Sequence, residues 1–423
     1  MSDEDMKLEN TSSGLQESEN KTQQEHTDEI TASGEVSEAN LESDQQMQSA
    51  SSKIESKEYN NENSNENSND SKRKQINVYK LLRIAFSVGF VVFAALFINE
   101  VFVTPYRINR SIEKTDRLYK PNMANTNQNT ATPAPTIDPT DVELLKNAEP
   151  DTNSEEAATA MEPNRDSQGR LLQFKDLLAV NEDVKGWITV PESNIDYVVM
   201  QSANGDPEYY LTRDIEKQEL KAGSLFLDSK CSIENKSQNL TIHGHNMTST
   251  DNMFHYLIKY KELDYYKERP VLTFDTIYQT GQWKIFSVFI TNGSSVKEKF
   301  FDYTKPKFNG DSDFLNYIYQ LRNRSILNID SVDINESDQL LTLSTCSYEV
   351  KNYRTVVVAR KVRDGENPSV DVDRVTVNPE PLYPYSYYYR YGGKAPELTE
   401  TFEEALENGE IKWYTPAIEV STE

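Results

Sequence analysis

One long apolar run stands out in an otherwise polar N-terminal third of the chain. Residues 84–103 are almost wholly apolar, and Asn99 and Glu100 interrupt them only near the end. About 20 apolar residues in a helix cross a hydrocarbon core. The run starts too far from the N-terminus for a cleavable signal peptide, and no Ala-x-Ala cleavage site directly follows it. We therefore predict a transmembrane helix at 84–103, with a buried helix of a soluble domain as the alternative.

Basic residues flank this helix on both sides. Those before it form the tighter cluster, which favours a cytoplasmic N-terminus and a C-terminal part outside the cell. The cluster before it is Lys72, Arg73, Lys74, Lys80 and Arg83, and the one after it is Arg107, Arg110, Lys114, Arg117 and Lys120.

Two polar stretches border the apolar run. Residues 1–71 hold 18 acidic residues against four lysines and only one aromatic residue, Tyr59. Such a segment cannot bury enough apolar surface to fold, so we expect a disordered acidic cytoplasmic tail, with a binding tail as the alternative. Residues 104–165 include the Pro/Thr-rich stretch 130–139 and are expected to be an extended extracellular linker.

Short apolar runs of strand length begin near residue 166 and continue to residue 363. Their alternation and β-branched content predict many strands and few helices, which fits a β-barrel. The expected strands are 186–190, 195–200, 223–227, 240–243, 270–274, 283–291, 339–344 and 355–361. Helical spacing of apolar residues predicts helices at 171–180, 249–260 and 311–322, and a short one at 398–406.

Composition narrows the possible functions. The chain of 423 residues has 36% hydrophobic residues and a net charge of −25. This acidic balance argues against nucleic-acid binding, which needs a basic patch. The two cysteines, Cys231 and Cys346, are too few for a disulfide framework, and their pairing with each other is the less favoured reading.

The candidate chemistry lies at strand ends. Cys346 closes the run Leu341–Thr345, and Arg354 opens the next strand after a short turn, so the two side chains can face each other. A cation next to a thiol favours the nucleophilic thiolate. A buried structural cysteine is the alternative for Cys346, and a surface ion-pair arginine is the alternative for Arg354.

Two histidines follow an upstream apolar run. His243 and His245 flank Gly244, and their spacing alone does not choose between them. Either one can carry a proton for a nearby thiol. The pair could also suggest a zinc site, but no further cluster of histidines or cysteines completes one in the sequence, so no metal is expected.

These features together resemble a known family. Leu343-Ser344-Thr345-Cys346, the arginine eight positions later and Gly244-His245-Asn246-Met247 are similar to motifs of the class B sortases. Further similar stretches are 181–188, 194–199, 209–211 and 222–228, so the resemblance extends over residues 170–363.

The resemblance implies a fold and a site. The fold would be mainly β, an eight-stranded sortase barrel with an N-terminal helix and a long helix before the cysteine strand. Cys346 would be the nucleophile, His245 the proton carrier and Arg354 the oxyanion or substrate holder. Ser344 and Thr345 are candidates for orienting substrate. An acidic residue just after the cysteine, discussed for this family, is replaced here by Ser347.

The resemblance also implies an activity. The expected enzyme is a membrane-anchored cysteine transpeptidase that needs no cofactor and no calcium. It would cleave a C-terminal sorting motif of secreted proteins after Thr. It would then transfer the protein to an amine of a peptidoglycan precursor or cross-bridge in a Gram-positive bacterium.

Two alternatives remain open. One is a pilin-polymerising sortase with a lysine acceptor. The other is a catalytically idle, wall-binding barrel that uses the Tyr/Pro-rich extension at 364–423. Such an extension is unusual for the family, and its tyrosines could pack on the barrel or stack on sugar.

Overall fold

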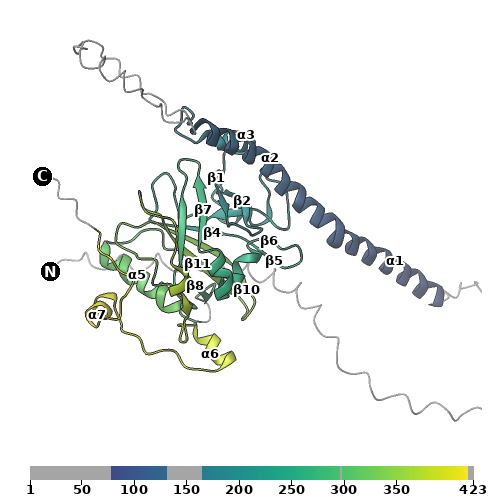
Figure 1. The fold of residues 1–423 in the computed structure, drawn as a ribbon. Coiled ribbons are helices and arrows are strands. Elements are labelled where there is room, and N and C mark those ends of the chain that lie inside the picture. Colours follow the sequence, from purple (N-terminus) through teal and green to yellow (C-terminus); the bar gives the residue numbers. More distant parts are fainter. Residues whose placement is uncertain (1–77, 131–163, 296–297, 418–423) are drawn as a thin grey trace, which may run out of the picture. The chain divides into compact units, whose positions relative to one another are not determined.

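The computed structural model describes residues 78–130, 164–295 and 298–417 (Figure 1). In this part of the chain, eight strands close into a barrel in the order β1-β2-β3-β4-β10-β11-β8-β7. The barrel strands are β1 Val184–Thr189, β2 Asp196–Met200, β3 Leu225–Leu227, β4 Asn239–His243, β7 Val271–Thr276, β8 Gln282–Asn292, β10 Leu340–Ser347 and β11 Tyr353–Lys361. Each of the eight predicted strands coincides with one of them, so the predicted barrel is confirmed.

The register of the barrel brings distant segments together. β4 pairs with β10 in parallel, with His243 opposite Ser344. β10 and β11 form an antiparallel hairpin, with Cys346 opposite Arg354. Long β-branched runs such as Val356–Val358 are fully buried, as expected for strands covered on both faces.

Short strand pairs and helical turns complete the fold. β5 Asn246–Met247 pairs with β6 Asn252–Met253, and β9 Leu327–Asn328 pairs with β12 Thr376–Val377. The 3₁₀ segments are 172–174, 209–212, 255–261 and 372–374.

Helix α1 (Val78–Ile98) contains the apolar run and continues through a π-helical turn at Asn99–Val103. Large apolar side chains around α1 are exposed, among them Phe86, Phe90 and Phe93. By length and composition it is apolar enough to cross a membrane. A soluble domain would bury such a helix, so its exposed apolar surface is consistent with a lipid environment.

Helix α2 (Thr104–Thr130) replaces the first half of the predicted linker. Its residues Ile108, Thr115 and Tyr119 are buried, and the Tyr119 ring stacks on Trp187 of β1 at 4.3 Å between ring centroids. The Tyr119 hydroxyl also donates to Asp275 of β7. The prediction was wrong here because charged residues on the outer face hide a helical stripe that packs on the barrel. Of the rest of the predicted linker, residues 131–163 lie outside the described residues, as does the predicted tail at 1–71.

Two other helix predictions were only partly right. Residues 249–260 do not form one helix, because Asp251 and Met253 have φ near +56°, which a right-handed helix does not allow. The chain instead forms β6, a 3₁₀ segment and α4 (Leu263–Glu268). The predicted helix 171–180 consists of a 3₁₀ turn followed by α3 (Lys175–Val180).

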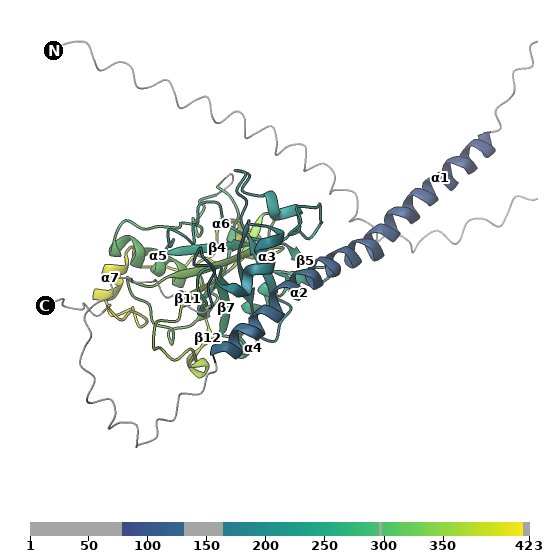
Figure 2. The ribbon, with the colours of Figure 1, turned by 90° about the horizontal axis from the view of Figure 1, so that it is seen from above.

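The long helix before the cysteine strand is α5 (Asp311–Arg324), which begins with Asp311 and Asp313, as suits the helix dipole. Helix α7 (Phe402–Glu407) of the C-terminal extension lies beside it (Figure 2). Asn316 of α5 donates to Glu403 at 2.9 Å and accepts from the Phe402 amide at 2.9 Å. These contacts and the buried Phe402, Ala405 and Trp413 attach the extension to the barrel.

Helix α6 (Tyr385–Tyr391) of the extension contacts two loops of the barrel domain. Ser386 donates from its amide and its hydroxyl to the Glu298 carboxylate, at 2.9 and 2.5 Å. Tyr391 donates to the Glu349 carbonyl at 2.7 Å. We call these contacts the α6 clasp, because they hold the β8–α5 loop and the β10–β11 turn to one short helix.

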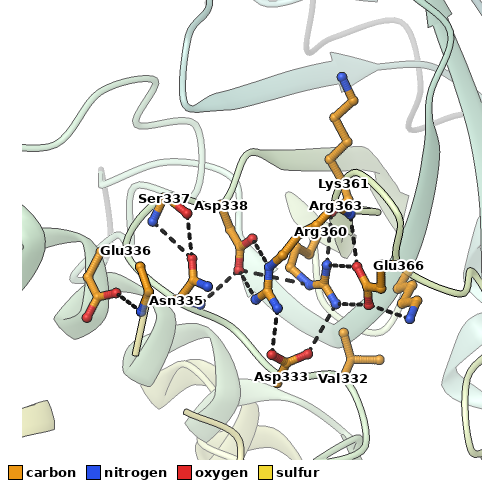
Figure 3. A network of polar contacts seen from close by, with 12 residues as sticks. Val332, Asp333, Asn335, Glu336, Ser337, Asp338, Arg360, Lys361, Arg363 and Glu366 are labelled. Carbon is orange, nitrogen blue, oxygen red and sulfur yellow. Dashed lines mark hydrogen bonds and ion pairs between the residues drawn. The ribbon is translucent and has the colours of Figure 1, made fainter. Parts of the chain in front are cut away.

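A charged network stabilises the other end of β11 (Figure 3). The Arg360 side chain has no exposed surface and donates to both Glu366 oxygens at 2.6 and 2.7 Å. Arg363 bridges Asp333 and Asp338 at 2.7 Å each, and Lys284 pairs with Glu366 at 2.5 Å. The network fixes the start of the C-terminal extension, because Glu366 is a residue of the extension.

The network predicts a loss of stability in acid. Burial raises the pKa of Glu366, but hydrogen bonds from Arg360 and Lys284 outweigh it and hold the pKa far below its usual range. Because the folded pKa is depressed, the stabilisation is complete above the unfolded value of about 4.3 and is lost as pH falls. We expect the free energy of unfolding in urea to fall between pH 5 and pH 3, and to fall less steeply in Glu366→Gln. Equal slopes for the two proteins would contradict this account.

Candidate active site

A cavity of about 380 Å³ opens where β3, β4, β10 and β11 end. Its lining includes each residue that the sequence assigned to catalysis or substrate orientation: His245, Ser344, Thr345, Cys346 and Arg354. The sheet order explains the convergence, because β4 and β11 are the two neighbours of β10. Residues distant in sequence therefore meet at the Cys346 end of one three-stranded segment.

Cys346 and Arg354 are direct cross-strand partners in the β10–β11 hairpin. Opposite residues of an antiparallel pair have Cα atoms about 5 Å apart and share a face. Both side chains are partly exposed, so the thiol and the guanidinium are accessible from the cavity. Gly293 keeps the guanidinium free, because a Cβ there would lie 3.2 Å from Arg354 Cζ and 2.8 Å from the Asn352 carbonyl.

His245 follows β4 and lies on the cavity wall. Its Nε2 is 3.0 Å from the Leu211 carbonyl, to which it donates. Burial lowers the pKa of His245 and the nearby Arg354 charge lowers it further, against the hydrogen bond to Leu211, which raises it. The preceding Gly244 is required by packing, because a Cβ at this position would overlap Leu225 and Phe254.

His243 has a carboxylate partner in the same cavity. Its Nε2 is 3.0 Å from Asp228 Oδ2, and its ring lies 5.4 Å from that of Phe226. Burial raises the pKa of Asp228, but hydrogen bonds from His243 and the Lys230 amide outweigh it and lower the pKa. The His–carboxylate pair of this site thus involves His243, whereas His245 contacts a backbone carbonyl.

The hydroxyls of Ser344 and Thr345 have partners inside the protein. Ser344 Oγ is 3.0 Å from the Tyr303 hydroxyl, and Thr345 Oγ1 donates to the Gly244 carbonyl at 2.8 Å. Thr345 therefore fixes the turn that carries His245. Both residues line the cavity, but in this structure their hydroxyls form hydrogen bonds with other residues of the protein.

A chain of hydrogen bonds reaches the Cys346 end of β10. Asn246 Nδ2 donates to the Cys346 carbonyl at 3.0 Å, and its Oδ1 accepts from His255 Nδ1 at 2.7 Å. His255 Nε2 lies 3.3 Å from Asp251. Asn246 thus holds β10 in place beyond the point where its pairing with β4 ends.

Sequence reasoning missed Asp228, Asn246 and Tyr303. Asp228 and Asn246 lie in stretches that carried the resemblance, yet nothing in the sequence pairs Asp228 with His243 or Asn246 with Cys346. Tyr303 comes from the β8–α5 loop, and nothing in the sequence indicates its contact with Ser344. Among the described residues, no group of three or more His, Cys, Asp or Glu is placed to hold a metal ion.

The part of the chain that forms this cavity is similar to known proteins. Residues 188–362 match the model of the sortase domain. Over 181 residues the chain is 31% identical to sortase B of Listeria monocytogenes, covering 43% of this chain and 69% of that relative. The chain belongs to the class B sortases.

Two further relatives of this class B sortase come from other species. Sortase B of Staphylococcus aureus is 28% identical over 193 residues, which cover 45% of this chain and 75% of the relative. The crystal structure of sortase B from Clostridium perfringens is 31% identical, with a TM-score of 0.41 over 45% of this chain and 99% of that one. Sortases are cysteine transpeptidases.

The two cysteines of this sortase should differ sharply in reactivity. Cys231 is 4% exposed, and burial raises the pKa of its thiol to about 12, whereas Cys346 opens to the cavity beside Arg354. With a chromogenic disulfide at pH 7, we expect one fast thiol in the native protein and the second only after unfolding. Cys346→Ala should remove the fast phase. Two fast thiols, or a fast phase that survives Cys346→Ala, would contradict the assignment.

Proposed function

We propose that this class B sortase cleaves a C-terminal sorting motif after Thr and transfers the protein to an amine of the peptidoglycan. The observation that carries the proposal is the convergence of Cys346, His245 and Arg354 on one cavity at the ends of adjacent strands. Family membership supports the reaction class, and the resemblance of the motifs supports cleavage after Thr.

In the first half of the reaction, the Cys346 thiolate attacks the Thr carbonyl carbon. Arg354 donates hydrogen bonds to the oxygen that becomes negative in the tetrahedral intermediate. The C–N bond breaks, and His245, which has taken the proton of the Cys346 thiol, gives this proton to the departing amine, so that a thioacyl-enzyme remains. Arg354 suits this role because a guanidinium presents several donors in a planar fork.

In the second half, the acceptor amine attacks the thioester carbonyl. His245, now neutral, accepts the amine proton, a peptide bond forms and the C–S bond breaks. The low pKa of His245 that burial produces favours this neutral form near pH 7. The same group thus serves as acid and then as base.

We further infer that α1 anchors the enzyme in the cell membrane with the N-terminus in the cytoplasm and the barrel outside. The exposed apolar surface of α1 and the basic residues before it support this orientation. Its partners would be secreted proteins with a sorting motif and peptidoglycan amines.

The test uses residues 104–423, because α2 packs on the barrel and has to be retained. This fragment is incubated with a panel of sorting-motif peptides and an amine acceptor, and products are followed by mass spectrometry. Cleavage after Thr with the acceptor joined supports the proposal. His243→Phe should retain single-turnover cleavage and His245→Ala should lose it. Thiol labelling of Cys346 without cleavage of any peptide would speak against the proposed reaction.

The electrostatics of His245 can be tested without substrate. We expect its imidazole to titrate below pH 6.5, because burial and the Arg354 charge both disfavour the imidazolium. In Arg354→Gln the midpoint should rise, since one of these two causes is removed. Two-dimensional NMR of labelled histidines gives both midpoints, and His245→Gln assigns the resonance. A midpoint that is unchanged in Arg354→Gln would show that the two groups do not interact.

A further inference from the structure

A second cavity, of about 520 Å³, lies next to the catalytic one. Its walls come from the end of β8, the β8–α5 loop, the last turns of α5 and residues 382–385 of the extension. The extension lies beyond residue 362, where the match to the sortase domain ends. One wall of this cavity is therefore built from residues outside the shared domain.

The two cavities are neighbours in the barrel. Phe300 lines both of them. Thr291 lines the second cavity and is the cross-strand partner of Arg354, which lines the first. Adjacent strands lie about 5 Å apart, so the walls of the two cavities come within the length of a short peptide of each other.

Arg324 is a cation without an acidic partner in this second cavity. Its guanidinium lies 4.2 Å from the centre of the Phe301 ring, and Nη1 donates to the carbonyl and the side chain of Gln320 at 2.8 and 2.7 Å. No carboxylate among the described residues forms an ion pair with it. Burial lowers the pKa of Arg324 to about 10, because desolvation disfavours the charged form.

The carboxylates that share the lining, Glu298 and Asp302, form hydrogen bonds with residues other than Arg324. Glu298 accepts two hydrogen bonds from Ser386, and Asp302 accepts from the amide and the hydroxyl of Thr304. A half-buried guanidinium without a counterion gains most from an anion that brings its own charge. The planar fork of arginine fits a carboxylate with two parallel hydrogen bonds.

We propose that the cavity around Arg324 binds the carboxylate of the acceptor, so that the enzyme prefers amines carried by an amino acid or peptide with a free carboxylate. The inference rests on the proposed function, because it assigns the acceptor of the same reaction. With the amine at the thioester of Cys346, the carboxylate reaches the neighbouring cavity. Phe301, Tyr383 and Tyr385 supply apolar walls between which the acceptor backbone can lie.

The experiment compares acceptors that differ only in this carboxylate. Glycine oligomers of one to five residues, each as the acid and as the amide, are offered to the full chain in detergent micelles. An intact sorting peptide that the enzyme cleaves is supplied with them. The oligomer length with the lowest KM reports the distance between the two cavities. At the best length, we expect the acid to have a KM about tenfold lower than the amide, as a charge-assisted hydrogen bond provides.

Arg324→Gln should abolish this preference, while Arg324→Lys, which keeps the charge, should retain part of it. The rate of thioacyl formation should stay unchanged in both variants.

A binding measurement separates this inference from the proposed function. Cys346→Ala cannot turn over, so calorimetry with the same acids and amides reports acceptor binding even if no sorting peptide is ever cleaved. Tighter binding of the acid that disappears on adding Arg324→Gln supports the site. Equal binding of acid and amide at every length, or a preference that survives Arg324→Gln, overturns it. Inorganic pyrophosphate that binds through Arg324 more tightly than any acid would assign the cavity to a phosphate and overturn the carboxylate.

Discussion

Replacing Cys346 with alanine is expected to abolish cleavage and transfer, with a fall in rate of roughly 10⁴-fold or more. Without the thiol no thioacyl-enzyme forms, and the remaining groups can act only by binding and polarising the peptide. The barrel should be unaffected, because Cys346 is partly exposed and its main-chain contacts, including the bond from Asn246 to its carbonyl, do not need the side chain.

Cys231→Ala is the matched control. This cysteine is the other thiol of the chain and lies buried under β4, with its sulfur 3.4 Å from the Asn239 carbonyl. We expect the variant to retain cleavage. Mass spectrometry of peptide products measures both variants, and trapping of an acyl adduct at Cys346 identifies the intermediate. Residual cleavage of more than about one per cent in Cys346→Ala would require another nucleophile.

The Arg360→Met variant should lose about 3–5 kcal/mol of stability, as expected when one partner of a buried ion pair is removed. Methionine fills much of the volume but leaves Asp338, whose side chain is 2% exposed, and Glu366 with less compensation. Urea unfolding followed by tryptophan fluorescence measures the loss, because Trp283 and Trp187 are buried in the barrel.

Arg363→Met is the control for this prediction. The Arg363 side chain contacts Asp333 and Asp338 of the same network but is 31% exposed, so its loss should cost clearly less. Arg360 lies six residues from Arg354 along β11, about 20 Å at strand spacing. Per folded molecule, neither variant should therefore change cleavage. Equal losses in the two variants would mean that burial of Arg360 is not what makes the network stabilising.

The eight strands could be predicted because each one is a short apolar, β-branched run between turn residues. Helix α2 could not, because its buried face consists of a few residues such as Ile108 and Tyr119 among many charges. What makes it a packed helix is the ring of Trp187, more than 60 residues away. Likewise, the left-handed backbone at Asp251 and Met253 depends on tertiary contacts that local spacing does not contain.

For the site, a hairpin was enough to place Cys346 opposite Arg354, since a short turn fixes the register of two strands. The choice between the two histidines could not be made from local sequence. His243 and His245 have the same spacing relation to Gly244, and their difference lies in Asp228 and Leu211, which come from other segments. Arg324 gave no signal at all, because an arginine at the end of a helix is an ordinary helix-dipole residue until its surroundings are known.

The α6 clasp makes the extension an intramolecular ligand of its own enzyme. Because it is tethered, the segment that holds Glu298 and Glu349 is present at an effective concentration of about millimolar or more. The same residues supplied as a free peptide to a chain cut after residue 363 would have to reach that concentration to restore both loops. Dilution of the cut chain and its peptide would free both loops, whereas dilution of the intact enzyme would leave them held.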